Sequence, residues 1–332
     1  MWPRVLFMLV TLVSLYILFP SLLSVFRSWP ELLKLNPVWY VVMLGVECAS
    51  FGCAWGLQRL ALRTDRWFGV ATAQLAGNAF SRVVPAGAAA GAAVQYKMLT
   101  DTGIPAAQVG SGLTTASLIS TGTLFALPIL SVPAALAGRP TPHGLAQAAW
   151  LGGLVFVVGF AAGWILLRHK NALRATGRTI QRIRNRLFSK RPPMQDLPDT
   201  LVKERHAIIE TLGDGWWKAL LFALGNWLFD YLALLAAIAA TGSHVRPTLV
   251  LLAYAASMVL GMIPITPGGL GFVEAGLTGL LALAGVPAGQ AALATLAYRL
   301  VSFWLPLPAG AVAAALHRRR YRGRTVSPEP AG

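Results

Sequence analysis

The sequence predicts an all-α, polytopic membrane protein built from an inverted repeat with two re-entrant (broken) helical hairpins. Three observations lead to this fold class. The 332 residues are 56% hydrophobic and only 12% charged, with a mean hydropathy of +0.61, so a soluble domain could not bury its apolar surface. Two breaks rich in proline and glycine interrupt the apolar stretches. These two breaks also share a common pattern of spacing, which is typical of an internal repeat.

Six apolar stretches are long enough to cross a bilayer, which requires about 20 residues of helix. The first is too long for the core of a signal peptide, so we interpret it as a retained span. The predicted full spans are residues 5–26, 37–62, 106–136, 144–167, 216–241 and 288–316. The shorter runs 67–80, 87–99, 247–262 and 268–284 flank the two breaks, and we expect each to form only part of a crossing.

The basic residues predict the orientation of the chain. The net charge is +16, and residues 168–206 carry a large excess of Lys and Arg over Asp and Glu. Lys and Arg concentrate in cytoplasmic loops, so we expect this segment and both termini to be cytoplasmic, in the cell (inner or plasma) membrane. We interpret the segment as a loop that sets topology, with a specific lipid site as the alternative. Membrane topology accounts for the charge better than nucleic-acid binding, so no nucleic-acid partner is expected.

The second break, within residues 263–285, reads IPITPGGLGFVEAGLTGLLALAG. Proline lacks the backbone N–H that a helix needs, and glycine leaves the backbone uncovered, so the preceding helix must end here. Irregular backbone at membrane depth is tolerated only inside protein or beside a wet cavity. Pro264 and Pro267 are predicted to break the helix, as Pro85 and Gly87 are in the first break. Gly268, Gly269 and Gly271, followed by the carboxylate of Glu274, are predicted to line a polar site.

A shift of 182 positions aligns the first break with the second without a gap. Pro85 falls on Pro267 and Gly87 on Gly269. We therefore divide the single transmembrane domain, residues 1–332, into a first repeat (37–138), a cytoplasmic basic loop (168–206) and a second repeat (216–320). Counting crossings gives the two repeats opposite orientations. This is the layout of secondary transporters, whose broken helices meet near mid-membrane.

Five ionisable side chains fall within the predicted spans and breaks: Glu47, Arg82, Asp230, Glu274 and Arg299. A charge in lipid is costly, so each should face the protein interior or a cavity and find a partner. An ion pair between Glu274 and Arg299 is the simplest arrangement. Such a pair is either purely structural or part of a site in which Arg299 or Arg82 receives a phosphate. Glu47 and Asp230 either bind a proton or pair with an arginine.

The sequence gives no support for catalysis or a metal site. The five histidines are scattered at the ends of spans, and the two cysteines lie in one apolar span without metal-ligand spacing. No acid, nucleophile and base come together, which makes an intramembrane hydrolase the least favoured reading. We therefore expect no catalytic residues, no metal and no cofactor.

The motif IPITPGGLGFVEAGL, the following GVP, and Arg299 with Phe303-Trp304 resemble the transmembrane domain of the lysylphosphatidylglycerol synthase family of flippase-like membrane proteins. The resemblance covers residues 35–316. Family members often carry Gly-Glu in the first repeat, whereas here Gly91 is followed by Ala92. A mechanism that needs an acid in both repeats is therefore not expected for this chain. The soluble aminoacyl-transferring domain has no counterpart, so synthase activity is not expected.

The resemblance implies that the protein moves or handles lipids with charged or sugar-bearing head groups. The leading prediction is a non-enzymatic translocase for an anionic or polyprenyl-phosphate-linked lipid. The alternative is an accessory subunit that presents lipid to a membrane glycosyltransferase or synthase. In both cases the substrate-binding residues would be Arg82, Glu274, Arg299, Gly268, Gly269 and Gly271.

Overall fold

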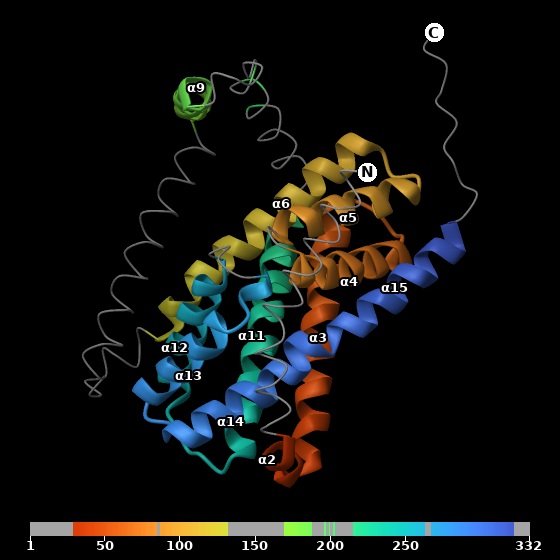
Figure 1. Ribbon diagram of the computed structural model, residues 1–332. Coiled ribbons are helices and arrows are strands. Elements are labelled where there is room, and N and C mark those ends of the chain that lie inside the picture. The colour runs from red at the N-terminus through yellow and green to blue at the C-terminus, as the bar shows by residue number, and fades with distance from the viewer. Residues whose placement is uncertain are drawn as a thin grey trace, which may run out of the picture.

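The computed structural model describes residues 29–84, 87–131, 169–187, 215–262 and 267–321, together with the single residues 196, 199 and 202. These residues form helices and their connections, without strands (Figure 1). Within them, four helical stretches are long and apolar enough to span a membrane: Pro37–Ala61, Ala106–Leu130, Trp216–Ala240 and Ala288–Tyr321. They confirm four of the six predicted spans. The other two, residues 5–26 and 144–167, lie outside the described residues.

The first half contains helices that begin where their sequence signals lie. Asn36 accepts a hydrogen bond from the N–H of Val38 (3.0 Å) and so caps α3, and Pro37 occupies the first helical position, where its missing N–H costs nothing. The elements are α2 (Trp29–Lys34), α3 (Pro37–Ala61), α4 (Trp67–Val83), α5 (Gly87–Asp101), α6 (Ala106–Ala126) and η1 (Leu127–Ser131).

The second half repeats this order of a long helix, a shorter helix, a break and two further helices. The elements are α11 (Trp216–Ala240), α12 (Pro247–Gly261), η3 (Pro267–Gly269), α13 (Phe272–Leu283), α14 (Ala288–Arg299), η4 (Leu300–Trp304) and α15 (Pro306–Tyr321). The equal order is what a repeat requires. The opposite orientation of the halves, the re-entrant path of the breaks and the proposed domain boundaries stay predictions.

Two predicted boundaries in the second half need correction. The helix after the second break begins at Phe272 and not at Gly268, because glycines 268, 269 and 271 have φ of 59°, 71° and 77°, which a right-handed helix cannot include. The last span runs to Tyr321, beyond the predicted end at residue 316, and is interrupted by the π-helical segment η4. Pro85 and Pro264 lie outside the described residues.

The centre of the bundle is the long pair α3 and α11, which pack along each other. Ser50 on α3 and Asn226 on α11 exchange hydrogen bonds, from Ser50 Oγ to the Asn226 carbonyl (2.9 Å) and from Asn226 Nδ2 to the Ser50 carbonyl (3.1 Å). Helix α4 packs on α5 and on α15. A Cβ atom at Gly91 would lie 2.5 Å from the Gly77 carbonyl oxygen, so α4 and α5 approach closely at these glycines, as expected of small residues between membrane helices.

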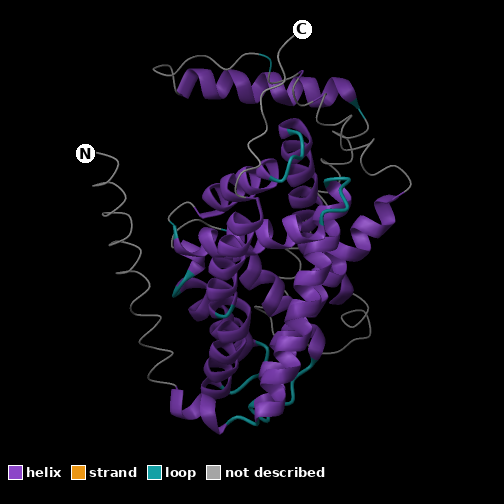
Figure 2. Ribbon diagram, turned by 90° about the vertical axis from the view of Figure 1, so that its right-hand side faces the viewer, coloured by secondary structure: helices purple, strands orange, loops and turns teal. Residues whose placement is uncertain are grey.

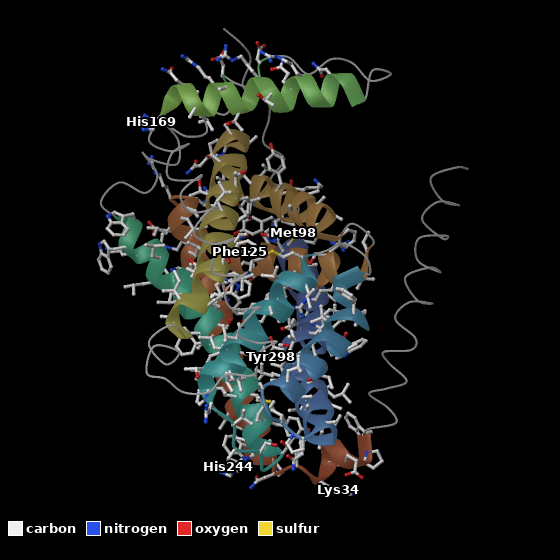
Figure 3. The ribbon with its side chains drawn as sticks, turned by 90° about the vertical axis from the view of Figure 1, so that its left-hand side faces the viewer. Lys34, Met98, Phe125, His169, His244 and Tyr298 are labelled. Atoms are coloured by element: carbon white, nitrogen blue, oxygen red, sulfur yellow. The ribbon has the colours of Figure 1, made fainter. Side chains whose placement is uncertain are left out.

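Helix α9 (Lys170–Leu187) lies across one end of the bundle as a separate helix (Figure 2). Its sequence is strongly basic and amphipathic, which is typical of a helix lying on a membrane surface. His169, just before α9, and His244, between α11 and α12, lie at opposite ends of the bundle, and Tyr298 lies inside it, away from both ends (Figure 3). The basic helix therefore marks one face of the protein.

Candidate functional site

The turn before α13 is built around a carboxylate. Glu274 lies in the first turn of α13, and its Oε2 accepts a hydrogen bond from the backbone N–H of Gly271 (2.6 Å). This bond satisfies one of the free N–H groups at the start of the helix, and a negative charge there also interacts favourably with the helix dipole. The glycine conformations at 268, 269 and 271 bring the turn back toward α14 and η4. Gly271 itself has open space around its Cα, so its left-handed φ, and not close packing, requires glycine.

Arg299, the last residue of α14, forms the predicted ion pair with this carboxylate. Its Nε donates to Glu274 Oε1 at 2.8 Å, and the two side chains are only 9% and 17% exposed. A second donor, Nη2, lies 3.3 Å from the Gly268 carbonyl oxygen. The pair thus joins the tip of the second break to the last span.

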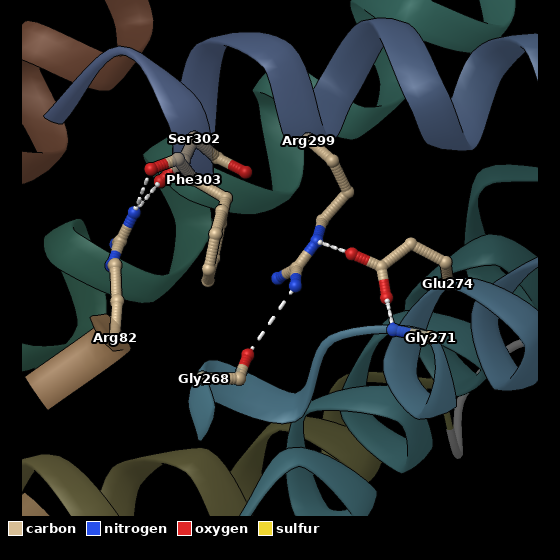
Figure 4. A network of polar contacts seen from close by, with 7 residues as sticks. All are labelled: Arg82, Gly268, Gly271, Glu274, Arg299, Ser302 and Phe303. Carbon is tan, nitrogen blue, oxygen red and sulfur yellow. Dashed lines mark hydrogen bonds and ion pairs between the residues drawn. The ribbon is translucent and has the colours of Figure 1, made fainter. Parts of the chain in front are cut away.

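Arg82 reaches the same span from the end of α4. Its Nη1 donates to the carbonyl oxygens of Ser302 and Phe303, both at 2.7 Å (Figure 4). The Ser302 carbonyl is available because Pro306 lacks the N–H that would reach it in α-helical spacing. A positively charged side chain replaces this missing backbone donor.

The Phe303 ring separates the two arginines. The guanidinium carbon of Arg82 lies 5.0 Å from the ring centroid and that of Arg299 lies 4.3 Å from it, and Figure 4 shows the ring between them. Each contact is a cation–π interaction, worth about 0.5–2 kcal/mol depending on desolvation. The turn closes on the same ring, since a Cβ atom at Gly268 would lie 2.6 Å from Cε2 of Phe303 and 3.1 Å from the Arg82 carbonyl oxygen. The ends of the two breaks therefore meet here.

Glu47 and Asp230 form a second polar cluster beside Arg82. They come from the packed helices α3 and α11, where each lies about one turn from the Ser50–Asn226 contact, and the two carboxyl groups interact electrostatically. Asp230 Oδ2 accepts from the hydroxyl groups of Tyr254 and Tyr298, the latter at 2.8 Å. Both acids also interact electrostatically with Arg82. From the sequence we expected Glu47 and Asp230 each to bind a proton or to pair with an arginine. Their proximity to each other was not predicted.

Sequence reasoning missed three aromatic residues of the site: Tyr254, Tyr298 and Phe303. Tyrosine in membrane helices concentrates at the interfaces, so a tyrosine in the middle of an apolar segment is the signal by which the first two could have been found. Phe303 was noted only as part of a motif, because an apolar ring in an apolar span carries no signal of its own.

A polar groove opens between α3, α4, α6 and α11. Its volume is about 240 Å³, and its polar lining residues are uncharged: Gln58, Gln74, Ser117, Ser120, Thr121 and Asn226. Gln58 Nε2 donates to Gln95 on α5 (2.6 Å), and Trp55 donates to Gln74 (2.8 Å). Sequence analysis did not predict this groove, because its residues come from four helices.

Residues 5–310 match the family described as the lysylphosphatidylglycerol synthase TM region. The chain belongs to this family. A UPF0104 membrane protein of Methanothermobacter thermautotrophicus is 29% identical over 92 residues, which are 28% of this chain and 28% of that protein. The matched part therefore spans less than a third of that relative. No solved structure matches the chain.

Membership of the lysylphosphatidylglycerol synthase TM family confirms the resemblance inferred from the sequence motifs. The predicted residues that the structure brings together are Arg82, Glu274, Arg299 and Gly268, with Gly269 and Gly271 in the same turn. Gly87 does not join them, because it begins α5 and packs against the backbone of Ser81. Among the residues searched, no group of three or more His, Cys, Asp or Glu could hold a metal ion.

Proposed function

We propose that this protein is a lipid translocase of the cell membrane for an anionic or polyprenyl-phosphate-linked lipid. The observation that carries the proposal is the arrangement of Arg82 and Arg299 on either side of Phe303. Only one acid, Glu274, forms an ion pair with either of them in the described part of the chain. A phosphate group is the natural ligand for two such guanidinium groups.

Each arginine retains donors that a ligand could use. Among the described residues, Arg82 donates only from Nη1 and Arg299 only from Nε and Nη2, so Nη2 of Arg82 and Nη1 of Arg299 have no protein acceptor there. A phosphate oxygen at each free donor would satisfy a charged donor that is costly to leave without an acceptor at membrane depth. The groove lined by amide and hydroxyl side chains suits a head group that carries hydroxyls or sugars.

Support for movement of the lipid comes from the order of elements in the two halves. Two repeats of opposite orientation, with breaks that meet between them, would expose the site to each leaflet in turn by rocking of one half against the other. In this proposal both termini and the basic segment 168–206 face the cytoplasm. The protein would perform no covalent chemistry, and its partners would be membrane lipids.

The deciding experiment is a leaflet-accessibility assay in liposomes that contain the purified full-length protein. Fluorescent phosphatidylglycerol and a labelled polyprenyl phosphate would be tested separately. We expect the wild-type protein to move the probe from the inner to the outer leaflet, where an external reagent can reach it. Arg299→Ala should slow this at least about tenfold, since a hydrogen bond to a charged group contributes about 1.5–3 kcal/mol. Arg59→Gln is the control, because Arg59 pairs with the exposed Asp65.

An accessory role gives a different result in the same liposomes. A subunit that only presents lipid to a glycosyltransferase or synthase would bind the probe with the same dependence on Arg299 but would not change its leaflet. Equal transport by wild type and Arg299→Ala would contradict a phosphate-binding role for this arginine.

A further inference from the structure

The Glu47–Asp230 pair has features that structural packing does not explain. Glu47 is 6% exposed, and its Oε2 has no hydrogen-bond partner among the described residues. Neither acid forms an ion pair with a Lys, Arg or His of the described residues. A buried carboxyl oxygen without a donor is costly, and the cost is removed if the carboxyl group carries a proton.

The groups that face the pair come from three neighbouring helices. Tyr254 of α12 and Tyr298 of α14 donate to Asp230, and Arg82 of α4 is the basic group that interacts with both acids. The two tyrosine hydroxyls donate to Asp230, whereas Oε2 of the neighbouring Glu47 receives no donor from the described residues. Two adjacent acids out of water repel when both are ionised, so the pair is suited to share a proton.

The charges of the two clusters depend on each other through Arg82. Arg82 and Arg299 contribute two positive charges and Glu274 one negative charge. With one shared proton, the Glu47–Asp230 pair contributes one negative charge, and the five groups are neutral together. An anionic phosphate would then leave one uncompensated negative charge at membrane depth, which a second proton at the pair would neutralise.

We propose that the Glu47–Asp230 pair is a proton-binding site, and that occupation of the arginine site by a phosphate anion is linked to uptake of one proton at this pair. The second part rests on the proposed function, whereas the first does not. Tyr298 and Arg299 are consecutive residues of α14, one bonded to Asp230 and the other to Glu274. A shift of α14 on ligand binding would therefore move the groups that bind Asp230 and Glu274 together.

The proton site can be tested without any lipid substrate. Infrared difference spectra of the full-length protein in phosphatidylcholine nanodiscs would follow the carbonyl band of a protonated carboxylic acid as the pH is lowered. We expect a band that is lost in Glu47→Gln and in Asp230→Asn and kept in Glu31→Gln, since Glu31 is exposed and pairs with Lys34. If wild type and Glu47→Gln give the same acid bands, the proton site is wrong. If a variant does not fold, the rate of deuterium exchange of the wild-type band decides: slow exchange is expected of the buried Glu47, and exchange as fast as that of exposed acids overturns the proton site.

The linkage is tested with phosphodiester probes, whose charge does not change with pH. Short-chain phosphatidylglycerol and dimethyl phosphate distinguish a lipid from a free anion as the ligand. Uptake of the second proton predicts that the dissociation constant rises about tenfold per pH unit across the range in which the ligand-bound protein holds two protons at the pair and the free protein holds one. In the double variant Glu47→Gln/Asp230→Asn, which leaves no acid at the pair, the slope should fall to near zero. A titrating band with pH-independent binding overturns the linkage but not the proposed function. A titrating band without probe binding or transport overturns the proposed function and the linkage, and leaves the proton site.

Discussion

Tyr298 and Arg299 are consecutive residues at the end of α14, yet their side chains bind different acids: Tyr298 donates to Asp230 on α11, and Arg299 to Glu274 on α13. Successive residues on a helix point about 100° apart, so one turn of α14 faces both partners. Both bonds are 2.8 Å long. The end of α14 therefore fixes the position of α13 relative to α11.

The Glu274–Arg299 ion pair should contribute strongly to stability. We expect Glu274→Gln to lower the unfolding free energy by about 3 kcal/mol, because it leaves Arg299 buried without its anion. Reversible unfolding in mixed micelles would measure this. Asp65→Asn, which breaks an exposed pair, should change it by less than about 1 kcal/mol. Equal losses in the two variants would contradict the assignment of a buried pair.

Transport measurements on the same residues separate structure from ligand binding. Glu274→Gln and Arg299→Ala should each reduce transport, and the double variant should remain as slow as Arg299→Ala. The physical reason is that the Arg299 guanidinium is the proposed phosphate ligand. Removal of the Glu274 carboxylate cannot restore a ligand that Arg299→Ala has deleted. If the double variant regains full transport in liposomes, the pair is structural only.

Gly268 should tolerate no side chain. Gly268→Ala places a Cβ at φ of 59° and against the Phe303 ring, so we expect a loss of about 1–3 kcal/mol in unfolding free energy and slower transport. Gly279→Ala is the matched control, because Gly279 lies within α13 with open space around it and alanine favours a helix. A stability gain in both variants would show that the turn does not need a left-handed residue.

Pro306 keeps the Ser302 carbonyl free for Arg82. Pro306→Ala restores an N–H that competes for this carbonyl, so we expect transport to fall several-fold without loss of thermal stability. Pro105→Ala, which changes a proline before α6, should not affect transport through this route. Unchanged transport in Pro306→Ala would mean that the position of Arg82 does not depend on the missing donor.

The predicted orientation is tested by cysteine labelling in intact cells, in a background without Cys48 and Cys53. Lys190→Cys, in the basic loop, should be protected from an impermeant reagent, since this loop is expected to be cytoplasmic. His244→Cys, exposed at the opposite end of the bundle from His169, should be labelled. Labelling at position 190 from outside would rule out the topology.

Sequence reasoning succeeded where a single physical constraint decides the outcome. Hydropathy located the four described spans, because about 20 apolar residues have few alternatives to crossing a membrane. The scarcity of charge in the apolar segments predicted the Glu274–Arg299 pair, because an unpaired ion at membrane depth is too costly.

The remaining features depend on tertiary packing or on local backbone geometry. Arg82 binds two carbonyls of the π segment, one of them left free by Pro306, and no hydropathy pattern reveals this. Glu47 and Asp230 meet because α3 and α11 pack in one register, which the sequence of either helix does not encode. The start of α13 was placed too early because proline and glycine mark a break but do not fix each glycine's φ.

The π segment η4 also has a mechanical consequence. The helix that contains it joins two groups of elements: α14, before η4, packs on α11 and α13, and α15, after η4, packs on α4. The contact between α15 and α4 is close, since a Cβ atom at Gly310 would lie 2.5 Å from the Leu75 carbonyl oxygen. One continuous rod thus connects both halves of the chain, and its π-helical turn is a place where helices commonly kink. If the halves rock, we expect the rod to bend or twist at residues 300–304, which include the two carbonyls held by Arg82. Spin labels at positions 292 and 312 would detect this twist as a change in their separation between lipid-free and lipid-bound protein, whereas a constant separation would show that the rod moves as one piece.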